Sequence, residues 1–302
     1  MTAMLLLALA GGALVLSAPL LARPLLRTAF RAPRRRERHD PGALDLPFRE
    51  VRFATARERR LFGWYLPPPD GAPAPAVAML HGWGGNAECM LPLAPALHRA
   101  GFALLLFDAR CHGRSDGDDF ASLPRFAEDL EHAVDWLKAN PDVDAGRLAV
   151  LGHSVGGAAA LLAASRRQDI GAVVSLAAFA DPHALMDRML ATKGIRYAPL
   201  RRWLLHEVER AIGARFADIA PVTTVRAVRR PVLLVHGLED RTVPPADAER
   251  IRAAGGDRVH LLSVPGAHHL ASGAIADQAP AVVGFLEEAL PAPEPADAFL
   301  SS

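Results

Sequence analysis

The chain has 302 residues, of which 51% are hydrophobic and 22% are charged, and its formal net charge is +1. This composition is sufficient to bury a full core, and the length fits one large α/β domain with additional segments. Two cysteines, Cys89 and Cys111, provide no disulfide framework and leave the redox compartment undecided.

Residues 3–22 form an apolar run without a charged residue. At about 1.5 Å per residue, a helix of this length crosses the ~30 Å hydrocarbon core of a bilayer. Seven arginines and one glutamate follow by residue 38. Because the positive excess is confined to this flank, no nucleic-acid partner is implied.

The position of these charges favours an anchor over a secretory signal. No Lys or Arg precedes the apolar run, as one would in a signal peptide, and the positive-inside rule places the arginines in the cytoplasm. We therefore expect an uncleaved, single-pass transmembrane anchor at 1–22, with the rest of the protein cytoplasmic. A cleaved signal peptide, or an apolar helix lying on the membrane or on the domain, are the alternatives.

A basic, Pro/Arg-rich linker is expected at 23–47, followed by the main domain at 48–290. Short apolar runs alternate with helical patterns through this domain, which predicts an α/β fold with a mostly parallel sheet and helices on both faces. The Pro/Ala/acid-rich residues 291–302 are expected to form a disordered tail. The expected strands are 50–54, 61–66, 77–80, 103–107, 148–151, 172–176, 231–235 and 259–264, and the expected helices are 89–100, 123–139, 154–167, 246–254 and 277–290.

Ser154 is the candidate nucleophile because it lies in the sequence Gly152-His153-Ser154-Val155-Gly156, between a strand pattern and a helix pattern. A serine at such a turn exposes its hydroxyl, and the flanking glycines allow backbone segments to approach. The backbone N–H of Val155, at the N-terminus of the helix, is then available to a developing oxyanion.

A serine nucleophile needs a histidine base and a carboxylate that orients it. Candidates for both follow later strands in the order Ser, acid, His: Glu239 and Asp240 after 231–235, and His268 and His269 after 259–264. Loops at the carboxyl ends of parallel strands lie at one edge of the sheet, where such folds place their sites.

Together these motifs resemble those of the α/β-hydrolase superfamily, in particular its esterase/lipase and serine aminopeptidase-like group. The resemblance covers roughly residues 48–290 and depends on HGWGGN (81–86), DARCHGRS (108–115), GHSVGG (152–157), HGLEDRTVP (236–244) and PGAHH (265–269). It assigns the acid to Asp240 rather than Glu239.

The same resemblance favours His269 over His268 as the base, although the doublet leaves the register open. It makes the N–H of Trp83 a second oxyanion-hole donor beside that of Val155, and it makes residues 181–228 a cap insertion. The cap's apolar side chains either line an acyl pocket or pack the cap onto the domain. In DARCHGRS, Asp108 and Arg110 are expected to brace the loop, and Cys111 stands where the family often has glycine.

The resulting hypothesis is a serine hydrolase that cleaves carboxylic esters, including lipid acyl esters, through an acyl-enzyme. A serine peptidase or amidase of the same fold, and a non-catalytic binding protein, are the alternatives. No cofactor and no metal site are expected, and the expected partners are a small-molecule or lipid ester and the membrane. The sequence leaves the acyl chain length, the head group and the oligomeric state open.

Overall fold

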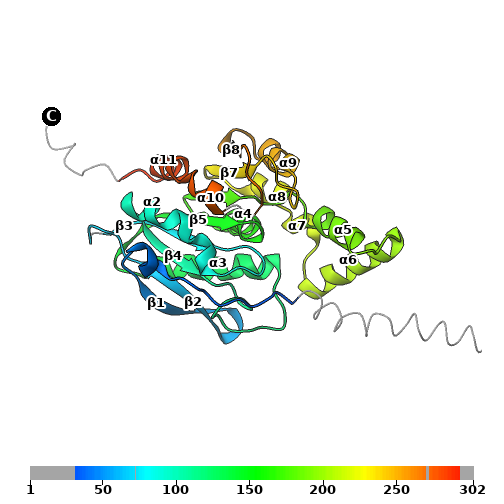
Figure 1. Ribbon diagram of the computed structural model, residues 1–302, viewed down its shortest axis with the longest axis horizontal. Helices are drawn as coiled ribbons and strands as arrows, with labels where there is room; N and C mark the ends of the chain where they lie inside the picture. The colour runs from blue at the N-terminus through cyan, green and yellow to red at the C-terminus, as the bar shows by residue number, and fades with distance from the viewer. Residues whose placement is uncertain (1–30, 72, 270–271, 293–302) are drawn as a thin grey trace, which may run out of the picture.

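The computed structural model describes residues 31–71, 73–269 and 272–292 (Figure 1). The expected anchor at 1–22, residues 23–30 of the expected linker and residues 293–302 of the expected tail lie outside this range. Within the described part of the chain, no helix is long and apolar enough to cross a membrane.

An eight-stranded sheet lies at the centre of the domain, in the order β1-β2-β4-β3-β5-β6-β7-β8. Strand β2 is antiparallel to both of its neighbours, β1 and β4, and all the other neighbouring strands are parallel. All eight expected strands, and the mostly parallel sheet, are therefore confirmed. The strands are β1 (Arg49–Thr55), β2 (Arg59–Leu66), β3 (Ala74–Leu80), β4 (Ala103–Phe107), β5 (Val143–His153), β6 (Ala172–Leu176), β7 (Val232–Gly237) and β8 (Val259–Val264).

Helices cover both faces of the sheet because alternate side chains of a buried strand point to opposite faces. In β3, Ala78 and Leu80 enter one hydrophobic cluster, whereas Val77 and Met79 enter a second. The first cluster contains side chains of α3 (Leu123–Lys138), α4 (Val155–Arg166) and α9 (Pro245–Gly255). The second contains side chains of α2 (Ala94–Arg99) and α11 (Ala279–Ala289).

The expected helix at 89–100 differs from the observed structure. A 3₁₀ segment, η3 (Ala87–Leu93), precedes α2, and the two contain Pro92 and Pro95. Proline lacks a backbone N–H and clashes with the preceding turn of an α-helix, so one continuous helix cannot form here. The remaining short elements are α10 (Ser272–Ala276), η2 (Ala56–Glu58) and η5 (Gly256–Arg258).

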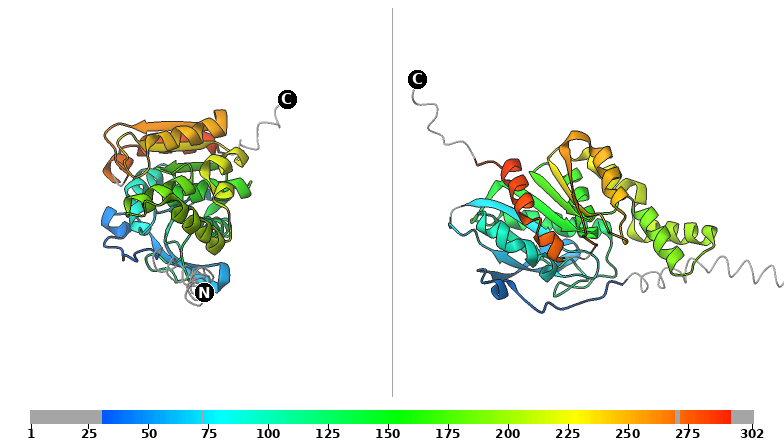
Figure 2. Two further views of the ribbon diagram at one scale, coloured as in Figure 1. Left: turned by 90° about the vertical axis from the view of Figure 1, so that its right-hand side faces the viewer. Right: turned by 45° about the horizontal axis from the view of Figure 1, so that its top comes forward.

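The segment between β6 and β7 forms the expected insertion. Its first two helices, α5 (Pro182–Thr192) and α6 (Ala198–Ile212), project together from one end of the molecule (Figures 1 and 2). The following α7 (Phe216–Ile219), α8 (Pro221–Thr224) and η4 (Val225–Ala227) return the chain to the body, where α8 and η4 contact α4.

Residues 31–46, which we call the strap, lie along the domain. The backbone N–H of Arg38 and the His39 ring both bond the Glu88 carboxylate at 2.8 Å, and Asn86 donates to the Arg35 carbonyl. The strap ends in η1 (Pro41–Leu44), and Leu46 is buried in the second cluster. The described part of the expected linker therefore contacts the segment that follows β3.

A pair of carboxyl groups, one of them buried, adds to this attachment. The Glu37 carboxyl of the strap meets that of Asp108, and burial together with this hydrogen bond raises the pKa of Glu37 to about 7. Asp108 in turn accepts the backbone N–H groups of Ala87 and Arg114. The bracing role expected for Asp108 is thus confirmed, and it extends to the strap.

Candidate active site

Ser154 lies in the turn between β5 and α4, with φ +55° and ψ −116°. A residue with a side chain adopts this conformation only under strain, so the surrounding structure must hold it in place. The Ser154 N–H donates to the Leu176 carbonyl at the end of β6, at 2.7 Å. The strained turn is therefore fixed from the neighbouring strand.

The glycines around Ser154 are required by the close approach of three backbone segments. A Cβ on Gly156 would lie 2.5 Å from the carbonyl oxygens of Leu80 and His81, and one on Gly152 would overlap the Gly156 carbonyl. A Cβ on Gly82 would lie 3.3 Å from that of Ser154. The loop after β3 is thereby held directly beside the serine.

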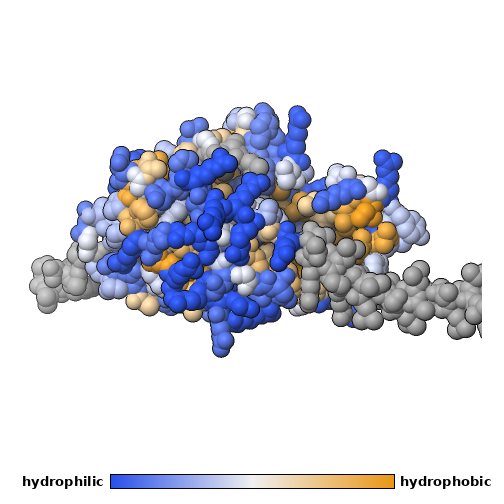
Figure 3. Space-filling view, turned by 60° about the horizontal axis from the view of Figure 1, so that its bottom comes forward, coloured by the Kyte–Doolittle hydropathy of each residue, from blue (hydrophilic) through white to orange (hydrophobic). Residues whose placement is uncertain are grey.

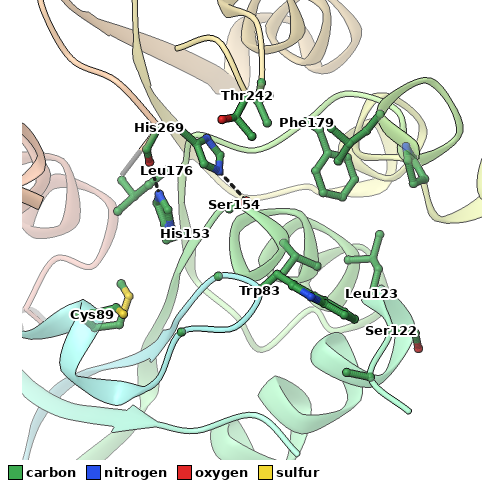
Figure 4. A pocket seen from close by; sticks show the side chains of 18 of the residues that line it. Trp83, Cys89, Ser122, Leu123, His153, Ser154, Leu176, Phe179, Thr242 and His269 are labelled. Carbon is green, nitrogen blue, oxygen red and sulfur yellow. Dashed lines mark hydrogen bonds between the residues drawn. The ribbon is translucent and has the colours of Figure 1, made fainter. Parts of the chain in front are cut away.

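The structure brings Ser154, His269 and Asp240 into one hydrogen-bonded chain. The Nε2 of His269 lies 3.0 Å from the Ser154 Oγ (Figure 4), and its Nδ1 lies 2.7 Å from the Asp240 Oδ2. With Nδ1–H donating to the carboxylate, Nε2 is free to accept the serine proton.

Asp240 is fixed as an acceptor by its own loop. Its Oδ1 accepts the backbone N–H groups of Thr242 and Val243, at 2.8 and 2.9 Å, and its carboxylate is fully buried. The His236 ring contacts the Val243 carbonyl at 2.9 Å from beneath the loop. These contacts leave Oδ2 directed at His269.

The other members of the pairs Glu239/Asp240 and His268/His269 do not face Ser154. The Nδ1 of His268 lies 2.9 Å from the Glu239 carbonyl, and 63% of the His268 side chain is exposed. The Glu239 carboxylate is also exposed and lies 4.0 Å from the His268 ring. Neither residue takes part in the chain that ends at Ser154.

His153 has a contact that the sequence analysis missed. Its Nε2–H donates to the backbone carbonyl of His269, at 2.8 Å. Burial, and then the neighbouring His269 ring, lower the pKa of His153 to about 4, so it is neutral at pH 7. Its position next to Ser154 was visible in the sequence, but its reach across to the β8 loop was not.

The loop after β3 forms a tight turn beside the serine. Gly85 N–H bonds the Gly82 carbonyl at 3.0 Å and closes a turn around Trp83. Among the described residues, the N–H groups of Trp83 and Val155 have no hydrogen-bond acceptor. The Trp83 ring stacks on Phe126, with ring centroids 6.4 Å apart.

His81 connects this loop to the one after β4. Its Nε2 accepts the Ala109 N–H at 3.1 Å, which means that Nδ1 carries the proton and donates to the Gly82 carbonyl at 2.7 Å. Complete burial lowers the His81 pKa to about 4 and keeps the ring neutral.

Arg110 braces the loop after β4, as the sequence predicted, and it does so through a buried ion pair with Asp129 that the sequence did not predict. Arg110 donates to Asp129 from both its backbone and its side chain. Cys111 has φ +67°, the left-handed conformation that favours glycine. The loop therefore keeps this conformation although a cysteine stands where the family often has glycine.

A cavity of about 1120 Å³ opens over Ser154 (Figure 4). The segment after β3, η1 of the strap and the cap all line it. Four of the cap side chains that the sequence marked as candidates reach it: Met186, Met189, Val208 and Ile212. Because these are apolar, as are Met90 and Leu91 of η3, which also line it, the cavity suits an apolar group.

Comparisons with known proteins identify the family of the chain. A family model for serine aminopeptidase, S33, matches residues 71–214. An uncharacterized protein of Mycobacterium tuberculosis is 33% identical over 221 residues, which cover 73% of this chain and 72% of that protein. The chain belongs to this hydrolase family.

Solved structures show the same fold. The esterase Pf2001 of Pyrococcus furiosus has a TM-score of 0.70 and 22% identity, with 86% of this chain and 98% of that chain covered. The esterase domain of a Rhodothermus marinus protein has a TM-score of 0.60 and 23% identity, with 80% and 99% covered. These similarities establish the α/β-hydrolase fold.

Replacing Gly156 with alanine is expected to disrupt the turn at Ser154, because the new methyl group would overlap the carbonyls of Leu80 and His81. We expect a loss of thermal stability together with loss of reactivity toward a fluorophosphonate, measured by calorimetry and by labelling. Gly284→Ala is the matched control, since a Cβ there has no neighbour within 4 Å. Equal behaviour of the two variants would contradict this account of the turn.

Proposed function

We propose that this protein hydrolyses carboxylic esters through an acyl-enzyme formed on Ser154. The observation that carries the proposal is the hydrogen-bonded chain from Ser154 through His269 to Asp240. In the first step, the Ser154 Oγ attacks the ester carbonyl carbon while His269 Nε2 takes the hydroxyl proton. Asp240 holds the imidazole in the required tautomer and stabilises the imidazolium that forms.

The negative charge that develops on the carbonyl oxygen is stabilised by the N–H groups of Trp83 and Val155. Two such preorganised donors contribute several kcal/mol to the transition state. The alcohol then leaves with the proton from His269, and the acyl group remains on Ser154. Water, activated by the same histidine, attacks the acyl carbon and releases the acid.

The cavity and the solved structures support an ester as the substrate. The cavity lining is predominantly apolar on both sides of Ser154, which favours an ester with an apolar acyl or alcohol part. The two solved structures reported above are named as an esterase and an esterase domain. Lipid acyl esters fit this chemistry.

A peptidase is the second candidate because the family is named for serine aminopeptidases. An aminopeptidase needs a group that recognises the substrate's α-ammonium. Among the described residues that line the cavity, Glu88 is the only acid, and both of its oxygens are engaged by Arg38 and His39. This arrangement favours the ester.

p-Nitrophenyl esters of increasing chain length, assayed beside aminoacyl-anilides, distinguish the two activities.

Ser154→Ala is expected to abolish labelling by a fluorophosphonate and to lower ester turnover on the order of 10⁴- to 10⁶-fold, because triad residues act as a unit. Labelling is measured by gel fluorescence and turnover with p-nitrophenyl esters. The neighbouring Ser175, whose hydroxyl is buried behind the turn, provides the control: Ser175→Ala should still be labelled. Undiminished labelling of Ser154→Ala would contradict the assignment of the nucleophile.

Two matched pairs test the base and the acid. His269→Ala is expected to lower turnover about as much as Ser154→Ala, whereas His268→Ala should retain substantial activity. Asp240→Asn should fold yet lose much activity, since an amide favours the wrong imidazole tautomer, and Glu239→Gln should have a mild effect. The opposite ranking of the two histidines would move the base to His268.

We also propose that residues 1–22 anchor the protein in a membrane, with the hydrolase domain in the cytoplasm. The support is the uncharged run at 3–22 and the arginines that follow it. The full chain is expected to remain in the membrane pellet after a carbonate wash, and a reporter fused after Ser302 should be cytoplasmic. A mature protein that begins near residue 20 and is recovered outside the cytoplasm would contradict the anchor.

A further inference from the structure

The projecting end of the cap carries exposed apolar side chains. We call residues 188–202, which include the end of α5, the turn and the start of α6, the cap tip. Met189, Tyr197 and Leu200 are 47%, 69% and 42% exposed and belong to the small set of large apolar side chains that face solvent in the described chain. Figure 3 shows apolar side chains gathered at the end of the molecule that α5 and α6 form.

Basic residues surround these apolar side chains. Arg201 pairs with Asp187 at 2.7 Å and donates to the carbonyls of Ile195 and Arg196, so it shapes the turn. Lys193, Arg196 and Arg202 are exposed, and Arg202 also interacts electrostatically with the Asp187 carboxylate that pairs with Arg201. The cap tip therefore combines an apolar centre with an excess of basic over acidic side chains.

Apolar and basic side chains together favour the surface of an anionic membrane. Tyrosine and aliphatic side chains partition into the boundary between lipid headgroups and acyl chains, and lysine and arginine are attracted to anionic headgroups. A protein partner would have to provide a complementary acidic surface with an apolar centre. An anionic bilayer satisfies both requirements at once.

The cap tip also lies at the mouth of the cavity. Met189 and Lys193 are exposed in the cap tip and also line the cavity that holds Ser154. A surface that covers the cap tip therefore adjoins the entrance to the cavity.

The chain outside the described range restricts where a membrane can lie. The described chain begins with the strap, whose first residues lie toward the end of the molecule from which α5 and α6 project (Figures 1 and 2). Ala32 is buried, and Pro33 packs against Gly84, so this point is fixed on the domain. Eight residues separate the start of the strap from the end of the apolar run at Ala22, and the nine Cα–Cα steps between Ala22 and Arg31 span at most about 30 Å. Helix α6 has 15 residues and is about 22 Å long, so this reach is enough for the cap tip to touch the bilayer that holds the anchor.

We propose that the cap tip docks into the headgroup region of an anionic bilayer and holds the cavity mouth against it, so that ester substrates enter from the lipid. The proposal deepens the proposed function and depends on it for the substrate. Docking itself is a separate physical event, and it can be measured without turnover.

Protection from trypsin measures docking without any activity. The full chain carrying Ser154→Ala is reconstituted in vesicles of phosphatidylcholine alone or of phosphatidylcholine with phosphatidylglycerol. Cleavage after Lys193, Arg196 and Arg202 is then followed by mass spectrometry. We expect cleavage in the anionic vesicles to be slower on the order of tenfold or more, since several basic residues of the cap tip are attracted to the anionic surface together.

Variants of the cap tip provide the matched comparison. Tyr197→Ser with Leu200→Ser should restore cleavage at Lys193 in the anionic vesicles. Arg226 and Arg229, which are exposed and precede the amino end of β7, should be cleaved equally in both kinds of vesicle. Equal cleavage of the cap tip in both vesicles would overturn the proposal. Protection that persists in detergent would also overturn it, because a second copy or the N-terminal segment would then cover the cap tip.

A kinetic arm separates failure of docking from failure of the proposed function. In the chain with an intact Ser154, Arg196→Gln with Arg202→Gln is expected to slow hydrolysis of a long-chain ester held in anionic vesicles, while hydrolysis of p-nitrophenyl acetate is unchanged. Arg226→Gln with Arg229→Gln should slow neither. If neither ester is cleaved by the unmodified chain, the proposed function fails while the trypsin result still decides docking. If both esters are cleaved at the unmodified rate by the cap-tip variant, docking has no role in substrate entry.

Discussion

The strained turn at Ser154 is the constraint on which the rest of the site depends. The turn exists because β5, α4 and the loop after β3 approach within backbone contact, which Gly152, Gly156 and Gly82 permit. The hydrogen bond to the Leu176 carbonyl ties the turn to β6. A parallel sheet then delivers the loops after β7 and β8 to the same edge, where Asp240 and His269 meet the serine.

Loops are positioned here by hydrogen bonds to backbone groups rather than by packing alone. His81 joins the loop after β3 to that after β4, and His153 joins the serine turn to the loop after β8. Both rings are buried and neutral at pH 7, which suits a donor to a carbonyl. The strap is attached in the same way, since Glu37 contacts Asp108 in the loop after β4 and Arg38 donates to Glu88 in the segment after β3.

Most of the fold was predictable because its signals are local. Each strand is a short apolar run, and the order of Ser154, Asp240 and His269 along the chain follows from their positions after strands. Other features depend on contacts between distant segments. The bond from His153 to His269 spans 116 residues, and the packing of the strap on Gly84 and Glu88 spans about fifty. The break between η3 and α2 was the exception, since Pro92 and Pro95 were visible in the sequence.

The most direct test of the central claim is a crystal structure of the adduct formed with an alkyl fluorophosphonate. The account predicts phosphorus bonded to the Ser154 Oγ, with its oxygen about 3 Å from the N–H groups of Trp83 and Val155, and His269 still bonded to Asp240. The alkyl group should lie among Met186, Val208 and Ile212 under the cap. An adduct on another residue, or a phosphonyl oxygen directed away from both N–H groups, would contradict the account.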